Sequence, residues 1–572
     1  MKRLTKRILS LATSGLLAFS LMMSSAGDSF AAAYRPQKDS TTGLVFSTNP
    51  LANEVGKAVL DKGGNAFDAA VAVGYMLAVV HPSAGNIGGG GFAVLHTADG
   101  KDITLDFREE APKAAQKDMY LDKNKEPIDG LSVTGYKSAG VPGTVAGLNE
   151  LRAKYGTMPL SELIQPAIDA ANKGFPISDR QAETFVEEYD RLVKYPSSVK
   201  YFFKPDGKST YKEGEILVQK DLAKTLERIK KNGTKGFYEG ETANLIEKDM
   251  KKNGGLITKE DLKSYKPVWR EPVKGTYRGY DIISMGPPSS GGTHIIQILN
   301  TMENADIAKM GFGSSKKIHL MAEAERYAYA DRSEYMGDPA FVDVPVKKLT
   351  SKKYAKDIYN AIQKAGDKAT PSEKIKPGQL IKEPMHTTHY SIADFKGNAI
   401  AVTYTINYTF GSCATVDGAG FLLNDEMDDF SIKPGVPNVY GLVGGDANAI
   451  EAKKRPLSSM SPTIILKNGK VFMVVGSPGG ARIITTVSQV ISNVIDHGMD
   501  ISEAVEAPRF HMQWLPDELR VEKDTLVNDV REKLEKMGYK VSVQAPMGDV
   551  NAIIIDQQNK VMYGSKDPRT EF

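Results

Sequence analysis

The sequence predicts a layered α+β fold. Helix-like and strand-like segments alternate near the N-terminus, the middle of the chain is mostly helical, and the C-terminal part is rich in hairpins. With 41% hydrophobic and 25% charged residues, the chain has the composition of an ordinary globular protein. Its 572 residues exceed the size at which a single core stops growing, so we expect two domains or one large layered body.

Residues 1–31 are predicted to be a cleavable signal peptide. Basic residues precede an apolar stretch at 8–23, and Ser29, Ala31 and Ala33 fit the small-x-small cleavage rule. The alternative is an uncleaved membrane anchor, but the apolar stretch is short and no second hydrophobic block follows it. We therefore expect an exported protein, secreted or periplasmic, with no membrane segment in its mature form.

Charge and composition argue against several classes of function. The 73 basic and 70 acidic residues are dispersed and nearly cancel, so nucleic acid binding has no support. The single cysteine, Cys413, cannot form an internal disulfide and is either a packing residue or a catalytic thiol. His386 and His389 have H-x-x-H spacing, but on a strand they would point to opposite faces. We expect no metal ion and no cofactor.

The segment after the signal predicts a buried helix, a tight turn and a strand. Asn65 is suited to cap a helix, Asp68 would lie in its first turn, and residues 66–80 are apolar nearly all round. "GNIGGGGF" at 85–92 lacks the Lys-Ser/Thr of a phosphate-binding loop, and a strand follows it where such a loop needs a helix. We interpret it as a turn that lets backbones approach closely.

Further along, residues 151–350 alternate amphipathic helices with short loops. "MGPPSSGGTHIIQILN" at 285–300 predicts a turn that opens a helix, and its serines either face a site or serve the turn. Residues 364–386 have the composition of a linker. Beyond it we expect hairpins at 387–407 and 461–480, the second with an Asn468-Gly469 turn.

The first hairpin brings two threonines together. Its loop is predicted at 395–397, with Gly397 in the left-handed position, which centres the register on Lys396. Thr387 and Thr405 then face each other, with Cβ atoms about 5 Å apart. A slip of one residue would remove this pairing.

A threonine at the end of a linker suggests self-cleavage. The Thr387 hydroxyl would attack the carbonyl of His386, shift the acyl group from nitrogen to oxygen, and release a new N-terminus by hydrolysis. The freed α-amino group, with a pKa of about 7.7–8.0, suits a base for its own hydroxyl. The alternative is an uncut chain with two ordinary strand threonines.

A set of motifs carries a family resemblance over essentially all of the mature chain. The motifs are "TTHYS", "NDEMDDFS", "RPLSSMSP" and "GSPGGAR", with "GNIGGGGFAV" and "LDFREEAP" upstream. Together they closely resemble the γ-glutamyltransferases of the N-terminal-nucleophile (Ntn) hydrolase superfamily. The resemblance implies a four-layer αββα sandwich, made as one precursor and cut into a large subunit, 32–386, and a small subunit, 387–572, that pair as a heterodimer.

The resemblance also implies catalytic roles. Thr387 is expected to be the nucleophile and Thr405 its hydroxyl partner. Gly479 and Gly480 follow a strand and precede a helix, so their N–H groups are expected to stabilise an oxyanion. Ser477 does not fit a serine-hydrolase elbow, because Val475 stands where G-x-S-x-G needs glycine.

A γ-glutamyl substrate would present an α-carboxylate and an α-ammonium group to the pocket. By resemblance, Arg108 with Ser458 and Ser459 would bind the carboxylate, and Asn407 with Glu426 and Asp429 would bind the ammonium. Taken singly, these residues are better explained by salt bridges, caps and turns, but as a matched set they favour the site.

The 28 residues between Asp429 and Ser458 are implied to form a lid, with Tyr440 as its aromatic gate. Relatives that cut poly-γ-glutamate or long acyl chains tend to lack such a lid, so small donors such as glutathione and glutamine are expected. The group would pass to water or to amino acid and peptide acceptors. The rivals are another acylase of the superfamily and a secreted protein that binds glutamyl compounds without turnover.

Overall fold

The computed structural model describes residues 37–375, 387–433, 435 and 444–569. Two antiparallel sheets form its centre. The predicted signal peptide, His386 and the gate residue Tyr440 lie outside the described residues. Within the described ranges, no helix has both the length and the hydropathy that crossing a bilayer requires.

The two sheets stack face to face. The six-stranded sheet has, in spatial order, β2 (Gly43–Ser47), β10 (Thr388–Asp394), β11 (Ala399–Thr405), β3 (Gly90–His96), β4 (Asp102–Asp106) and β7 (Val268–Arg270). The seven-stranded sheet has β1 (Gln37–Asp39), β18 (Val561–Lys566), β17 (Asn551–Asp556), β13 (Lys470–Gly476), β12 (Thr463–Lys467), β9 (Tyr280–Ser284) and β8 (Val273–Tyr277). Strand β10 contacts both β13 and β17 across the interface.

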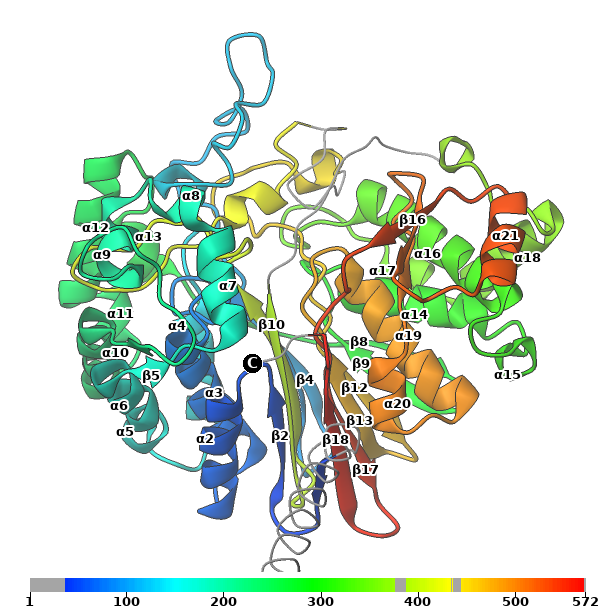
Figure 1. Ribbon diagram of the computed structural model, residues 1–572, viewed down its shortest axis with the longest axis horizontal. Helices are drawn as coiled ribbons and strands as arrows, with labels where there is room; N and C mark the ends of the chain where they lie inside the picture. The colour runs from blue at the N-terminus through cyan, green and yellow to red at the C-terminus, as the bar shows by residue number, and fades with distance from the viewer. Residues whose placement is uncertain (1–36, 376–386, 434, 436–443, 570–572) are drawn as a thin grey trace, which may run out of the picture.

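Helices cover the outer face of each sheet (Figure 1). On the six-stranded side lie α2 (Pro50–Asp61), α3 (Ala66–Val80), α4 (Thr144–Tyr155), α5 (Leu160–Leu163), α6 (Gln165–Lys173), α7 (Asp179–Glu187), α8 (Tyr189–Leu192), α9 (Pro196–Phe202), α10 (Lys220–Asn232), α11 (Lys235–Tyr238), α12 (Gly240–Asn253) and α13 (Lys259–Ser264). On the other side lie α14 (Gly291–Met302), α15 (Ile307–Met310), α16 (Ser315–Tyr335), α17 (Val346–Leu349), α18 (Lys352–Ala365), α19 (Arg482–His497), α20 (Ile501–Glu506) and α21 (Asn528–Lys536). The predicted four-layer αββα sandwich is confirmed.

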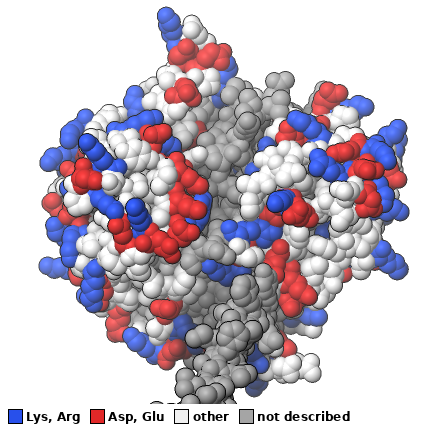
Figure 2. All heavy atoms as spheres, viewed as in Figure 1, with Lys and Arg blue, Asp and Glu red and all other residues white. Residues whose placement is uncertain are grey.

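Two small sheets and four 3₁₀ turns complete the described structure. The strands are β5 (Phe175–Pro176) with β6 (Ile216–Leu217), and β14 (Phe510–His511) with β15 (Leu519–Glu522) and β16 (Val541–Gln544). The turns are η1 (Tyr136–Ser138), η2 (Ser372–Lys374), η3 (Glu426–Asp429) and η4 (Asp446–Asn448). On the face shown in Figure 2, acidic and basic side chains are both spread over the described surface, in keeping with a net charge of +3.

Large and small residues alternate along β11, which suits a strand packed between a helical layer and a second sheet. Ile400, Val402 and Tyr404 pack into the core beneath α3, whereas Ala399 and Ala401 pack toward the other sheet. Successive side chains of a strand point to opposite faces, so large residues fill the helix side and small ones allow the sheets to approach. Burying each Ile or Val stabilises the fold by about 1.5–3 kcal/mol.

The predicted helix over 66–80 is observed as α3, and all of its residues are buried. The Asn65 side chain accepts from the backbone of Asp68, and the Asp68 side chain accepts from the backbone N–H of Asn65, so the pair forms a capping box. The glycine turn before β3 is also confirmed. A Cβ on Gly89 would lie 2.0 Å from the carbonyl oxygen of Thr405, so only glycine permits this approach.

The first hairpin has the predicted register, and the second has the predicted turn. Thr388 pairs with Tyr404 and Ala393 with Ala399, which is the register centred on Lys396, and Gly397 has a φ of +97°. Asn468 and Gly469 have φ values of +53° and +73°, as a type I′ turn requires.

The linker prediction is partly wrong. Residues 364 and 365 belong to α18, and the short turn at 372–374 is docked onto the body of the protein. Ser372 is buried and donates to the carbonyl oxygen of Trp514, while Ile375 packs in the core. Composition did not reveal this docking because it depends on partners about 140 residues away.

Candidate active site

The two threonines predicted to face each other do so. Thr387 directly precedes β10, and its Oγ1 donates to Thr405 Oγ1 at 3.4 Å. His389 and Ser391 continue the same face of β10 toward the other sheet, and Ser391 donates to the carbonyl oxygen of Asn551 in β17. The Thr387 side chain therefore lies where the two sheets meet, at the end of a central strand.

The turn that follows β11 holds the Thr405 side chain in place. Its hydroxyl oxygen accepts a hydrogen bond from the backbone N–H of Asn407 at 2.8 Å. Asn407 adopts a φ of +75°, and its side chain donates to the carbonyl oxygen of Asp425 at 3.0 Å. Asparagine is one of the few residues that tolerate this left-handed conformation. The turn therefore fixes both the Thr405 hydroxyl and the Asn407 side-chain amide.

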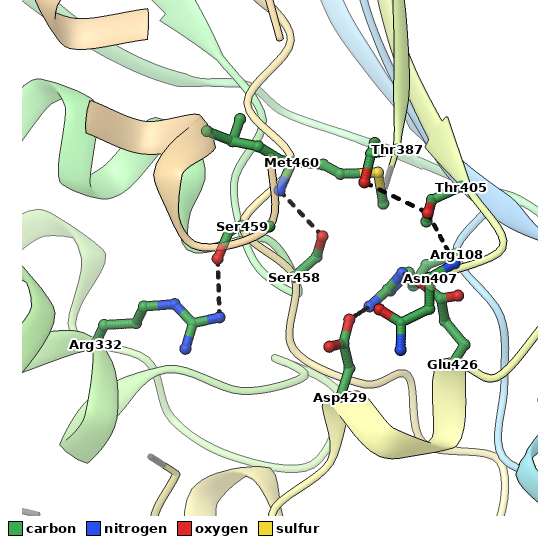
Figure 3. Close-up of a pocket in the computed structure, with 12 residues that line it drawn as sticks. Arg108, Arg332, Thr387, Thr405, Asn407, Glu426, Asp429, Ser458, Ser459 and Met460 are labelled. Atoms are coloured by element: carbon green, nitrogen blue, oxygen red, sulfur yellow. Dashed lines mark hydrogen bonds and ion pairs between the residues drawn. The ribbon is translucent and has the colours of Figure 1, made fainter. Parts of the chain in front are cut away.

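A small cavity opens beside the threonine pair (Figure 3). Of the predicted site residues that the structure describes, all but Gly479 line it: Arg108, Thr387, Thr405, Asn407, Glu426, Asp429, Ser458, Ser459 and Gly480. Arg332, Met460 and Ile483 line it as well, although they are not among the predicted site residues. The structure thus brings together residues from positions 108 to 480, while their chemical roles stay predictions.

The predicted oxyanion glycines lie in the turn between β13 and α19. Gly479 and Gly480 have φ values of +135° and +54°, a backbone that other residues rarely adopt. They precede the first turn of α19, where backbone N–H groups have no partner within the helix. Gly480 itself lines the cavity. This arrangement suits donation to an anion, as a helix N-terminus generally does.

Arg108 is the centre of a buried charge cluster. Its guanidinium donates to Glu426 and to Asp429, and Glu109 Oε2 lies 3.5 Å away. Burial opposes the charged form, but the carboxylates of Glu426 and Asp429 outweigh it and raise the pKa of Arg108. Burial raises the pKa of Glu426 and of Asp429, against the opposing effect of Arg108. One guanidinium shared by three carboxylates indicates that the cluster retains protons near neutral pH.

This cluster predicts a pH dependence of stability. Burial raises the pKa of Glu109 from 4.5 to about 8, so the folded protein keeps a proton that the unfolded chain has lost. Because the folded state binds more protons in this window, the free energy of unfolding falls as the pH rises from 4.5 to about 8. Glu109→Gln removes the titrating group, and we expect it to reduce the fall by about 4 kcal/mol over this range.

The measurement is the midpoint temperature of unfolding at pH 5.5 and pH 8. The difference between the two values should be smaller in Glu109→Gln than in the wild type. Glu227→Gln, at an exposed position on α10, is the matched control and should behave as the wild type does. Equal pH differences in all three proteins would show that Glu109 is ionised in the folded state.

Two of the missed residues belong to a serine-rich wall of the cavity. Ser458 Oγ accepts from the backbone N–H of Met460 at 3.1 Å, and Arg332 Nη2 donates to Ser459 Oγ at 3.1 Å. Figure 3 shows Arg332 approaching Ser459 from the side opposite Arg108. No local sequence signal marked Arg332, because its partners Ser290 and Ser459 lie 42 and 127 residues away along the chain.

The segment "MGDVNAI" at 547–553, to which the sequence assigned no role beyond packing, connects the start of β10 to the glycine turn before α19. Thr48 Oγ1 donates to Asp549 Oδ2 at 2.7 Å and lies 3.2 Å from Thr388 Oγ1, beside the predicted nucleophile. The backbone N–H of Asp549 donates to Ser477 Oγ at 3.0 Å, and Ser477 donates to the carbonyl oxygen of Pro478, next to the glycine turn. The motif therefore braces the head of β10 and the turn before α19.

Cys413 is buried outside the cavity lining. Burial raises the pKa of its thiol to about 12, so the reactive thiolate is disfavoured. Of the two interpretations left open by the sequence, the packing residue accords with these surroundings.

The fold and the site define a class. Two stacked antiparallel sheets between helical layers, with a threonine at the head of a central strand, are the architecture of the N-terminal-nucleophile hydrolases. A statistical description of the gamma-glutamyltranspeptidase family matches residues 52–571, and the chain belongs to that family.

Individual relatives agree with this assignment. The chain is 53% identical over 529 residues to a glutathione hydrolase proenzyme of Escherichia coli, covering 92% of this chain and 90% of the relative. It is similar to the crystal structure of Helicobacter pylori gamma-glutamyltranspeptidase, with 62% identity and a TM-score of 0.59 over 60% of this chain and 97% of the other. It also resembles cephalosporin acylase from Bacillus halodurans, with 28% identity and a TM-score of 0.83 over 94% and 96% of the two chains.

Proposed function

We propose that this γ-glutamyltransferase is exported, cleaves itself before Thr387, and then moves γ-glutamyl groups from glutathione or glutamine to water or to amino acid and peptide acceptors. The observation that carries the proposal is the pair of facing hydroxyls, Thr387 and Thr405, beside a cavity lined by both a guanidinium and carboxylates. The relative from Escherichia coli is a glutathione hydrolase made as a proenzyme, which supports both the substrate and the processing.

Processing would begin with the Thr387 hydroxyl. Its oxygen attacks the carbonyl carbon of residue 386, the peptide bond breaks as the acyl group moves to oxygen, and water hydrolyses the ester. The products are a large subunit, 32–386, and a small subunit, 387–572, once the signal peptide 1–31 has been removed. Strands β2 and β3 of the large subunit flank β10 and β11 of the small one within one sheet, so the subunits would stay together.

Turnover would use the new N-terminus. The α-amino group of Thr387, with a pKa of about 8, takes the hydroxyl proton as the oxygen attacks the γ-carbonyl of the donor. The N–H groups of Gly479 and Gly480 stabilise the oxyanion. The leaving amine takes the proton, and a γ-glutamyl ester on Thr387 remains. Water or an acceptor amine then attacks this ester and regenerates the hydroxyl.

Recognition would depend on the zwitterionic end of the donor. Arg108, Ser458 and Ser459 provide donors for the α-carboxylate. Glu426, Asp429 and Asn407 provide acceptors for the α-ammonium group. Tyr440 would close the lid over this end, which favours small donors over polymers.

A related acylase activity is the second candidate, because an acylase proenzyme of a Pseudomonas strain is 37% identical over 519 residues. Two substrates separate the candidates: glutathione, and a cephalosporin with a dicarboxylic side chain. We expect release of cysteinylglycine from glutathione, with a kcat/KM at least about a hundredfold above that for the cephalosporin. A preference for the cephalosporin would reverse the assignment, and binding of glutathione without any release would identify a binding protein.

A further inference from the structure

Ser477 has a buried hydroxyl that takes no part in the reaction steps above. It directly follows β13, precedes the glycine turn, and has no exposed surface. The hydroxyl donates to the carbonyl oxygen of Pro478 at 2.7 Å and accepts from the backbone N–H of Asp549 at 3.0 Å. A Cβ on Gly548, which has a φ of +79°, would lie 2.6 Å from Ser477 Oγ, so glycine permits this approach.

The N–H group of Asp549 determines the direction in which the Ser477 hydroxyl donates. A backbone N–H can only donate, so the serine oxygen accepts from it and keeps its own hydrogen for the carbonyl of Pro478. The Asp549 side chain accepts from Thr48 in turn. The glycine turn is therefore connected to the start of β10, where Thr387 lies.

The bond from Ser477 to Pro478 also determines where the next N–H group points. The carbonyl of Pro478 and the N–H of Gly479 belong to one planar trans peptide group, in which they point in opposite directions. Because the Ser477 hydroxyl holds this carbonyl, it fixes the direction of the Gly479 N–H as well.

The following peptide group is fixed by α19. The carbonyl oxygen of Gly479 accepts from the backbone N–H of Arg482 at 3.0 Å. The N–H of Gly480 shares this peptide plane and so points in the opposite direction, away from the helix, and Gly480 lines the cavity. Within the part of the chain that the structure describes, neither glycine N–H donates to a protein acceptor. The turn thus holds two donors ready for an acceptor that is not part of the protein.

We propose that Ser477 is a positioning residue for the oxyanion, because its hydroxyl holds the Pro478–Gly479 peptide group so that the Gly479 N–H is directed at the donor's carbonyl oxygen. This inference rests on the proposed function. Consecutive glycines leave the backbone many conformations, so a bond from a buried side chain is needed to keep one of them. A donor that is oriented before the reaction acts on the charge that develops in the transition state, so its loss affects the rate more than ground-state binding.

The test compares Ser477→Ala with the wild type in two measurements on the processed enzyme. The first is kcat/KM for γ-glutamyl-p-nitroanilide, per chain cut before Thr387 as counted by denaturing mass spectrometry. We expect it to fall about 10- to 100-fold, since complete removal of an oxyanion donor costs about 10²- to 10³-fold and this donor is only misaligned. The second is the inhibition constant of free glutamate, which fills the donor site without forming an oxyanion. It should change less than about twofold.

Ser488→Ala is the matched control. Ser488 lies on α19 and is also fully buried, and its hydroxyl has no hydrogen-bond partner among the described residues. This variant should resemble the wild type in both measurements. Ser477→Cys is the second test variant, because a thiol of similar size is a weak donor. It should lose less kcat/KM than Ser477→Ala, again with glutamate binding unchanged, and it supplies the test if the alanine variant does not fold or is not cut.

An unchanged kcat/KM in the Ser477 variants, or an equal weakening of turnover and of glutamate binding, would overturn the positioning role of Ser477 alone. A wild-type enzyme that does not turn over the γ-glutamyl anilide would overturn the proposed function as well.

Discussion

In the Thr387→Ala variant, we expect a single uncut chain that begins at residue 32, and no turnover. Alanine has no hydroxyl to attack the preceding carbonyl, and no nucleophile to accept the γ-glutamyl group. We expect kcat/KM on γ-glutamyl-p-nitroanilide to fall by at least about 10⁴-fold, as for the loss of other covalent nucleophiles. Denaturing mass spectrometry gives the chain masses, and anilide release gives the activity.

The adjacent threonine provides the matched control. Thr388 has its hydroxyl beside Thr48, away from the Thr387–Thr405 pair. Thr388→Ala should therefore still be cut before residue 387, with activity within about tenfold of the wild type. Cleavage of Thr387→Ala at the same position would point to an outside protease and contradict self-processing.

Arg108→Met should lower both stability and activity. Methionine keeps much of the side-chain length, but Glu426 and Asp429 lose the charge that they share. Breaking a buried ion pair in this way typically costs about 3–5 kcal/mol. The loss should grow as the pH rises from 6 to 8, because the remaining carboxyl groups must stay protonated to remain buried. Activity should fall about 10²- to 10³-fold, since the acidic wall also loses its alignment.

Midpoint temperatures and kcat/KM at pH 6 and pH 8 check this expectation. Arg180→Met is the control, because the ion pairs of Arg180 with Glu183 and Glu187 lie at the surface. Surface pairs contribute about 0–1 kcal/mol, so this variant should resemble the wild type. An Arg108→Met enzyme as stable as the control would show that the carboxylates do not depend on Arg108.

Local chemistry explains what could be predicted from the sequence. The helix over 66–80 was predictable because its cap and its apolar stretch are consecutive residues. The contact between Thr387 and Thr405 was predictable because a short loop with Gly397 at positive φ fixes every pair of the hairpin. The stacking of the two sheets was predicted only through the family resemblance. Residues such as Ala399 and Ala401 do not by themselves identify the surface that they face.

The parts that sequence reasoning missed depend on contacts between distant segments. The bond from Arg332 to Ser459 joins α16 to a loop beyond β11. The sequence indicated that Arg108 carries a positive charge, but its enclosure by Glu426 and Asp429 requires the fold. Likewise, the role of Asp549 became visible only when its backbone was found beside Ser477.

The most direct test of the central claim is to locate the covalent intermediate. The processed enzyme is mixed briefly with excess γ-glutamyl-p-nitroanilide, quenched in acid, digested and analysed by mass spectrometry. We predict that the peptide beginning at Thr387 carries one additional γ-glutamyl group, bound through an ester that hydroxylamine removes. Turnover with no adduct on that peptide, or with the adduct on another residue, would contradict Thr387 as the nucleophile.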